Sequence, residues 1–341
     1  MNILFDIGHP KDVNVFKNVI WKLQERGHEI KIVARAKENT KRVLEEYGFE
    51  YEVCKHHKKM IGKALGIITN DIHLYNIAKK FQPDVFVSPG SPYSAHVSRL
   101  LGKPHIAFSD TEIAGLVMKL TFPFTDKIYT SSSFYLDLGT KQTKFNGYYE
   151  LAYLHSKYFT PDIGVLKKYN LDEGYIILRL SALASHHDIG ARGFTFSSEE
   201  DLINVISFLE KYGRVIISSE TKQWKAISDY EIKFKPGDLH DILYYSKMCI
   251  GEGATMASEA AILGVPAVYV SNTHRGYLDE LETYGLAFTI QNRDEALEKA
   301  KSLLEDKFLE KSSKEKREKL LKEKIDVVEF MVNEIESSHK L

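Results

Sequence analysis

The residues best suited to chemistry lie in the segment 250–270. An apolar run leads into Gly251 and Gly253, which lack side chains and so let a ligand come close to the backbone. A helix is predicted to begin near Thr255, where free N–H groups and the positive end of the helix dipole suit a diphosphate. Glu259 lies one turn later on the same face, where a carboxylate can accept hydrogen bonds from a ribose diol. This spacing favours a nucleotide site over the alternative that the glycines only form a turn, Thr255 only caps the helix and Glu259 is a surface residue.

A second group of candidate residues accompanies the apolar run Tyr175–Leu180. Arg179 can bind phosphate through two parallel hydrogen bonds, and His187 can transfer a proton or neutralise a leaving diphosphate. His186 and Arg192 supply similar donors in the same segment. The two adjacent histidines also raise the alternative of a metal site. Because neighbouring histidines in one loop rarely converge on an ion without distant ligands, we predict no metal here.

Three residues in the first half are candidates for a general base: His9, Asp110 and Glu112. His9 directly follows the apolar run Asn2–Ile7 and its turn, and an imidazole titrates near neutral pH. Asp110 and Glu112 follow the run His105–Phe108, and either carboxylate could accept the proton of an acceptor hydroxyl. The structural alternatives are a neutral His9 hydrogen-bonded at a strand end, and a helix cap by Asp110 with Glu112 in its first turn.

The elements that must position these residues form two alternating series of strands and helices. In the first series we predict strands at Asn2–Ile7, Glu29–Ala34, Phe49–Val53, Val85–Ser88, His105–Phe108 and Lys127–Tyr129, and helices at Val13–Arg26, Lys41–Tyr47, Ile67–Phe81 and Ser94–Leu101. In the second we predict strands at Tyr175–Leu180, Arg214–Ser218, Met248–Ile250 and Ala267–Val270, and helices at Leu202–Lys211, Leu239–Ser246 and Met256–Leu263. Such alternation indicates parallel sheets covered on both faces, with ligand sites at the carboxyl ends of the strands.

The length of 341 residues predicts about two domains at roughly 150 residues each. The alternation lapses between residues 147 and 169, which we interpret as the connection between the halves. We therefore predict an N-terminal acceptor domain at 1–160 and a C-terminal nucleotide-sugar domain at 161–325. A C-terminal helix at 326–341 is predicted to pack back on the N-terminal domain.

Charge and composition exclude several classes of protein. The 46 Lys+Arg residues balance 47 Asp+Glu residues, so the chain lacks the basic character of a nucleic-acid-binding protein. Acidic residues interleave with basic ones in the charged segment 306–324, which predicts a solvated helix. Two cysteines support neither a disulfide framework nor a cysteine metal site. Without a signal-like start or an uninterrupted apolar span of about 20 residues, we expect a cytoplasmic protein. The apolar segment 113–124 is interpreted as core, with peripheral membrane contact as the alternative.

The segment 250–270 resembles the nucleotide-sugar motif of GT-B glycosyltransferases and of non-hydrolysing UDP-GlcNAc 2-epimerases. Together with Gly8–Pro10, Val15–Asn18 and Leu239–Tyr245, it makes nearly the whole chain similar to a largely archaeal family of GT-B-like proteins known only as a domain of unknown function. The resemblance implies two facing Rossmann-like, doubly wound domains with a cleft between them. It also implies phosphate contacts from a small-residue turn and a ribose contact from a helix glutamate. The matching positions are Gly253, Ala254 and Thr255 for phosphate and Glu259 for ribose.

The chain also departs from the families that it resembles. The corresponding first loop of the peptidoglycan UDP-GlcNAc transferase is richer in glycine, whereas Pro10 and Lys11 intervene here. Epimerases typically carry an aspartate where this chain has Ser91, and Asp110 and Glu112 lie near, but not in register with, the expected glutamate. The differences at Ser91, Asp110 and Glu112 disfavour an epimerase, whereas Pro10 and Lys11 weaken an assignment of phosphate binding to the first loop.

The sequence therefore predicts a glycosyltransferase that uses a nucleotide sugar, expected to be UDP-linked, without a further cofactor. The N-terminus of the helix predicted near Thr255, with Arg179 or a loop histidine, would stabilise the departing diphosphate. The acceptor, a glycan, a lipid-linked molecule or a small molecule, is left open, as is the oligomeric state. Two alternatives stay open: a sugar-nucleotide isomerase similar to UDP-GlcNAc 2-epimerase, and a binding protein without turnover.

Overall fold

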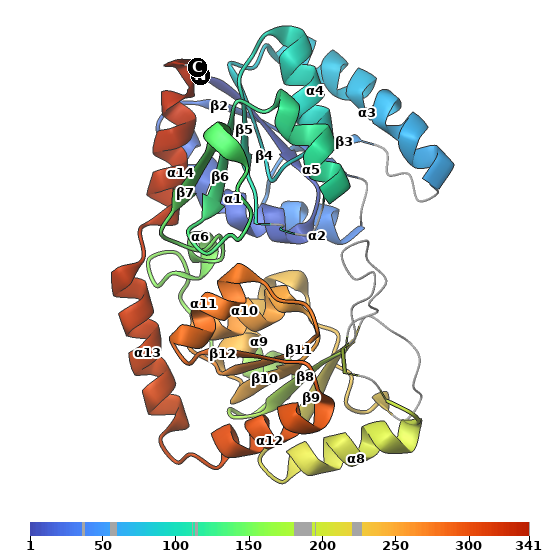
Figure 1. The fold of residues 1–341 in the computed structure, drawn as a ribbon, viewed down its shortest axis with the longest axis vertical. Helices are drawn as coiled ribbons and strands as arrows, with labels where there is room; N and C mark the ends of the chain where they lie inside the picture. Colours follow the sequence, from blue (N-terminus) through green and yellow to red (C-terminus); the bar gives the residue numbers. More distant parts are fainter. Residues whose placement is uncertain are drawn as a thin grey trace. The chain divides into compact units, whose positions relative to one another are not determined.

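The computed structural model describes residues 1–35, 38–54, 60–110, 112, 115–180, 193–194, 196–219 and 227–340. The chain divides into two compact units, shown in Figure 1. The N-terminal unit contains Met1–Tyr153 together with Ile325–Leu341, and the C-terminal unit contains Leu154–Lys324.

A seven-stranded parallel sheet forms the centre of the N-terminal unit, in the order β3-β2-β1-β4-β5-β6-β7. The strands are β1 (Asn2–Ile7), β2 (Glu29–Arg35), β3 (Tyr51–Cys54), β4 (Val85–Ser88), β5 (His105–Phe108), β6 (Lys127–Ser131) and β7 (Gln142–Phe145). In the register of the sheet, Ile3 pairs with Ile30 on one side and with Val85 on the other. Strand β1 is an almost continuous apolar run because its side chains are buried on both faces of the sheet.

Helices cover both faces of this sheet (Figure 1). They are α1 (Pro10–Glu25), α2 (Glu38–Glu46), α3 (Met60–Phe81), α4 (Pro92–Leu101), α5 (Gly115–Thr121), α6 (Leu151–Leu154) and α14 (Val327–Glu336), with 3-10 turns η1 (Phe122–Phe124), η2 (Gly139–Lys141) and η5 (Ser337–Lys340). The ring of Phe16 on α1 packs edge-on against Phe5, with centroids 5.4 Å apart. On the other side of β1, Leu4 joins a cluster with Leu74 of α3 and Val97 of α4.

The chain returns to the N-terminal unit at Ile325, whose N–H donates to the carbonyl of Asn146 (3.0 Å). Helix α14 then packs along α1, and its Phe330 lies against Phe145 with ring centroids 5.0 Å apart. The Tyr-rich start of the predicted connection belongs to this unit, since Tyr148 and Tyr153 are fully buried. These tyrosines are therefore part of the core.

The C-terminal unit is built on a second parallel sheet, in the order β12-β11-β10-β8-β9. Its strands are β8 (Ile176–Leu180), β9 (Val215–Ser219), β10 (Met248–Gly251), β11 (Ala267–Val270) and β12 (Ala287–Ile290). Its helices are α7 (Gly164–Lys168), α8 (Glu199–Glu210), α9 (Leu239–Tyr244), α10 (Ala254–Leu263), α11 (Gly276–Thr283), α12 (Arg293–Leu304) and α13 (Leu309–Glu323), with the 3-10 turn η4 (Pro236–Asp238). Figure 1 shows α8 and α12 on one face of the sheet and α9–α11 on the other.

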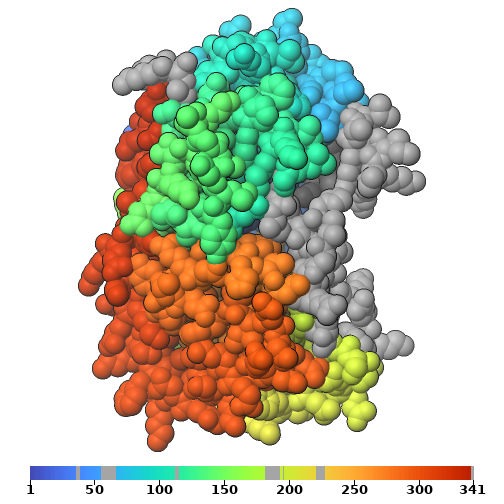
Figure 2. All heavy atoms as spheres, in the orientation of Figure 1, coloured from blue at the N-terminus to red at the C-terminus, as the bar shows by residue number. Residues whose placement is uncertain are grey.

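Helix α13 confirms the predicted solvated helix in the charged segment. Its buried residues are Leu309, Ser313 and Leu320, and most of its lysine and glutamate side chains are exposed on the unit's surface (red in Figure 2). Within the described part of the chain, no helix is long and apolar enough to cross a membrane.

The strand-and-helix alternation predicted from the sequence is confirmed, with shifts at element ends. Helix α1 begins at Pro10 rather than Val13 because His9 caps it and proline suits the first helical position. Helix α10 begins directly after Gly253, two residues before the predicted Met256.

Candidate functional site

Each sheet has one topological switch point, where successive strands begin to be added on the opposite side of the first strand. Open α/β sheets bind ligands at this point, outside the carboxyl ends of the strands. In the N-terminal unit this switch point lies between β1 and β4, and in the C-terminal unit between β8 and β10. Gly251 ends β10 and Arg179 lies at the end of β8. In the N-terminal unit, His9 follows β1 and Ser91 follows β4. His9, Arg179 and Gly251 therefore lie near the two switch points.

Two glycines let the chain turn from β10 into α10. Gly251 has φ +127°, and a Cβ added there would lie 2.1 Å from the carbonyl oxygen of Arg179. Gly253 has φ +104°, and an added Cβ would lie 3.4 Å from Cγ of Arg179. Gly251 needs glycine because of its left-handed backbone and this close approach, whereas at Gly253 the left-handed backbone favours glycine. The turn thus brings the start of α10 beside the end of β8.

The start of α10 exposes backbone donors without a side-chain cap. Gly253 is the N-cap residue, and it provides no side-chain acceptor for the first N–H groups. Ala254 and Thr255 follow, and both are partly exposed. Among the residues that the structure describes, the Thr255 hydroxyl has no hydrogen-bond partner. This helix end is therefore able to receive an anion.

Glu259 lies one turn into α10 and is 4% exposed. The alternative that Glu259 is a surface residue is wrong. His240 of α9 places its Nε2 atom 3.2 Å from Glu259 Oε1. A buried carboxylate of this kind requires polar partners, because burying an isolated charge is costly.

Arg179 lies beside the glycine turn, but its guanidinium is directed toward β9. Nη1 donates to Ser218 Oγ at 2.9 Å and approaches the Ser218 carbonyl at 3.4 Å. The side chain is half-buried. His187, with His186 and Arg192, lies outside the residues that the structure describes.

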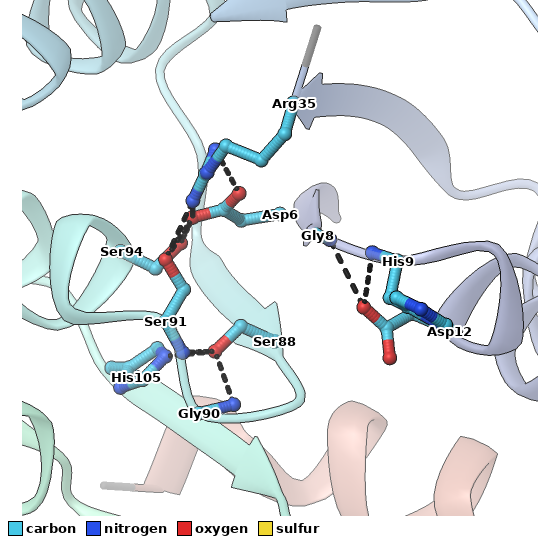
Figure 3. Close-up of polar contacts among 10 residues, drawn as sticks. All are labelled: Asp6, Gly8, His9, Asp12, Arg35, Ser88, Gly90, Ser91, Ser94 and His105. Carbon is cyan, nitrogen blue, oxygen red and sulfur yellow. Dashed lines mark hydrogen bonds and ion pairs between the residues drawn. The ribbon is translucent and has the colours of Figure 1, made fainter. Parts of the chain in front are cut away.

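The loop from β1 to α1 is a capping box, shown at the right of Figure 3. The Asp12 Oδ2 atom accepts from the backbone N–H groups of Gly8 (3.0 Å) and His9 (2.8 Å). His9 Nδ1 accepts from the N–H of Lys11 at 3.3 Å, and its ring is exposed. Burial, with the nearby charge of Asp110, raises the pKa of Asp12 to about 6 against the lowering effect of the two N–H donors. His9 is thus hydrogen-bonded at the end of β1, as its structural alternative describes, and it also caps α1.

Lys11 joins this loop to the carboxyl end of β5. Its Nζ forms ion pairs with Asp110 Oδ2 and with Glu150 Oε1, the latter at 3.0 Å. Glu112 Oε1 instead accepts from the N–H of Tyr135 at 2.7 Å. Residue 112 lies in a bend rather than in a helix, so Asp110 does not cap a helix there and Glu112 is not in a first helical turn. Lys11 therefore links Asp110 to the His9 loop, whereas the Glu112 carboxylate binds the backbone of Tyr135.

A buried ion pair that sequence reasoning missed lies at the switch point of the N-terminal unit (Figure 3). Asp6 is fully buried, and its two oxygens lie 2.7 and 2.9 Å from Nη1 and Nη2 of Arg35. Ser91 and Ser94 donate their hydroxyls to Asp6 Oδ2 at 2.5 and 3.0 Å. The guanidinium of Arg35 also lies over the ring of Tyr93, 4.2 Å from its centroid. The signal available in the sequence was a single aspartate inside an otherwise apolar strand.

The turn after β4 is held by Ser88, whose hydroxyl accepts from the N–H groups of Gly90 (3.1 Å) and Ser91 (2.9 Å). Ser88 Oγ also lies 2.9 Å from His105 Nε2. Burial lowers the pKa of His105 to about 3, so this imidazole is neutral at physiological pH. The carboxylate expected near position 91 in an epimerase is absent from the turn, and a structural carboxylate from β1 lies there instead.

The described residues contain no group of three or more His, Cys, Asp or Glu side chains placed to hold a metal ion.

Comparison with solved structures shows that the fold is of the GT-B class, as predicted. The complex of Staphylococcus aureus MnaA with UDP has a TM-score of 0.72 at 12% identity, covering 98% of this chain and 96% of that chain. The Methanocaldococcus jannaschii UDP-GlcNAc 2-epimerase has a TM-score of 0.68 at 14% identity, over 90% and 93%. The spinosyn forosaminyltransferase SpnP has a TM-score of 0.68 at 14% identity, over 100% of both chains. Transferases and epimerases thus share this fold.

The chain belongs to the family described as "Protein of unknown function (DUF354)", which matches residues 1–337. An uncharacterized protein of Methanocaldococcus jannaschii is 25% identical over 284 residues, covering 79% of this chain and 81% of that protein. The predicted membership of a GT-B-like family of unknown function is confirmed.

Proposed function

We propose that this protein is a nucleotide-sugar-dependent glycosyltransferase of the GT-B type. The observation that carries the proposal is the buried Glu259 one turn into a helix whose glycine N-cap leaves its first N–H groups without a side-chain acceptor. Gly253, Ala254 and Thr255 would bind the diphosphate of the donor, and Glu259 would accept hydrogen bonds from its ribose. The UDP in the MnaA complex supports a uridine nucleotide as the first donor to test.

The N-terminal unit would bind the acceptor and deprotonate its hydroxyl. Of the predicted bases, Asp110 is held by Lys11 beside the His9 loop, at the carboxyl ends of the strands. Glu112 is turned toward Tyr135. The geometry therefore favours His9 and Asp110 over Glu112. Direct displacement at the anomeric carbon needs one such base and a stabilised leaving diphosphate, which the positive end of α10 and Arg179 would supply.

Ser91 favours transfer over epimerisation. An epimerase needs carboxylates that move a carbon-bound proton, whereas the carboxylate beside Ser91 is Asp6, fully buried and paired with Arg35. Incubation with UDP-GlcNAc alone in D2O separates the two activities. Intact donor without deuterium at C2 supports a transferase, and exchange or inversion at C2 supports an isomerase.

Calorimetry with UDP-, GDP-, ADP- and TDP-sugars tests donor binding directly. Glu259→Ala should weaken binding by about 10- to 100-fold, because hydrogen bonds to a charged group contribute about 1.5–3 kcal/mol. The control is Glu298→Ala, an exposed glutamate of α12, which should leave binding unchanged. The proposal fails if none of the sugars binds or if Glu259→Ala binds as well as the wild type. Binding without consumption of donor, with acceptor extracts present, would identify a binding protein without turnover.

A further inference from the structure

His240 is a buried polar residue with no place in the proposed chemistry. It is the second residue of α9, which packs against α10, and it is 3% exposed. The ring of Phe159 lies edge-on to its imidazole, with centroids 6.3 Å apart. Across the helix pair, Nε2 lies 3.2 Å from Glu259 Oε1. This buried imidazole thus points at the carboxylate that we assign to ribose recognition.

The chemistry of the pair determines which atom carries the proton. A carboxylate that binds ribose must accept hydrogen bonds, and beside such an acceptor Nε2 is the nitrogen that donates to Glu259. This hydrogen bond opposes rotation of the carboxylate. A carboxylate that accepts hydrogen bonds from both hydroxyls of a ribose must be held in one orientation.

We propose that His240 is a positioning residue that holds the Glu259 carboxylate in the orientation that recognises ribose. Discrimination between a ribonucleotide and its 2′-deoxy analogue then depends on the Nε2 donor of His240. The inference rests on the proposed role of Glu259 in nucleotide binding. It adds a determinant of sugar specificity on a helix that lies beside the nucleotide-binding helix.

Three variants of the full-length chain test this role by calorimetry. His240→Leu removes the donor at similar volume. His240→Gln keeps an amide donor at a reach similar to that of Nε2. Glu259→Gln removes the charge of the acceptor. The probes are UDP, ADP and GDP, each against its 2′-deoxy analogue, and thermal melting of every variant controls for folding.

The expected result is a specific loss of discrimination. His240→Leu should lower the preference for the ribonucleotide by about tenfold, the effect of one hydrogen bond to a charged group, and leave affinity for the 2′-deoxy analogue nearly unchanged. His240→Gln should restore most of the preference. The double variant His240→Leu/Glu259→Gln should show the same ribonucleotide preference as Glu259→Gln alone. Adding His240→Leu should cause no further loss, because the two residues act through one interaction.

The outcomes separate this inference from the proposed function. If the wild type binds no ribonucleoside diphosphate, the nucleotide-binding proposal fails and the inference fails with it. If the wild type binds and prefers ribose, but His240→Leu keeps that preference or the two substitutions add independently, only the role of His240 is refuted. The same conclusion follows if His240→Leu weakens both analogues equally, as a purely structural residue would. Should His240→Leu fail to fold, the ribonucleotide preference of His240→Gln is compared with that of the wild type. A lost preference in that donor-retaining variant would refute the role.

Discussion

Removal of the Arg35 side chain is predicted to destabilise the N-terminal unit strongly. Asp6 is fully buried, and Arg35, itself 8% exposed, lies within 2.9 Å of both carboxylate oxygens. Arg35→Ala would leave the carboxylate with the hydroxyls of Ser91 and Ser94 but without a compensating charge. The charge would remain buried because the surrounding strands exclude water.

The magnitude follows from what remains buried in each variant. Breaking a buried ion pair by removing one partner costs about 3–5 kcal/mol, whereas replacing both partners by well-packed hydrophobic residues of similar volume is often close to neutral. Arg35→Ala should therefore lower the free energy of unfolding by about 3–5 kcal/mol. The double variant Asp6→Asn/Arg35→Met should lose clearly less, about 1–2 kcal/mol, because it leaves no uncompensated charge and only the buried Asn amide group lacks a partner.

Urea unfolding followed by tryptophan fluorescence measures this difference. The chain has two tryptophans, so a Trp224→Phe background leaves Trp21 of α1, which stacks on Phe49 in the N-terminal unit, as the single reporter. Arg42→Ala, at an exposed arginine of α2, is the matched control and should change stability by less than about 0.5 kcal/mol. Equal losses for Arg35→Ala and the double variant would refute the reasoning, because the cost would then not come from the unpaired charge.

Three further predictions follow from the two switch points. Gly251→Ala should lower the melting temperature and abolish diphosphate binding, since its Cβ would meet a β8 carbonyl at 2.1 Å. Gly174→Ala is the control, because Gly174 also has a positive φ (+85°) but open space around it, and it should cost far less; equal shifts in a thermal melt would contradict this. The raised pKa of Asp12, about 6 against an ordinary 3.8, contributes stability that is full below pH 3.8 and is lost as the pH rises through 6. Asp12→Asn should therefore gain about 1–3 kcal/mol relative to the wild type between pH 4 and 7, and a pH-independent difference in urea unfolding would exclude that explanation. Ser91→Asp would place a second carboxylate against Asp6 and should destabilise the protein more at pH 7 than at pH 4. It should not produce deuterium exchange at C2 of UDP-GlcNAc; exchange seen by NMR would overturn our preference for a transferase.

Features with a local physical cause were predictable from the sequence. Strand Asn2–Ile7 is an apolar run because its side chains are buried on both faces of a parallel sheet. The turn at Gly251 and Gly253 was identifiable because both glycines and the following helix lie in one short segment. The site assignments of His9, Asp110, Glu112 and His187 stay predictions.

Features that depend on the order of the strands were not predictable. Asp6 and Arg35 are 29 residues apart, and they meet because β1 and β2 lie side by side in the sheet. Ser91 reaches the same carboxylate because β4 is the other neighbour of β1. The sequence offered Asp6 only as an unexplained charge in an apolar strand.

The sequence by itself thus determined the two α/β series, their parallel sheets and the glycine turn before a helix with a glutamate, because periodicity and turn chemistry act over a few residues. Only the tertiary structure decided which of the charged groups are paired. Asp6 is bound by Arg35, Asp110 by Lys11, and Glu259 faces His240. The physical reason is that a buried carboxylate is tolerated only where a distant element brings it a donor, and strand order and helix packing determine which element arrives.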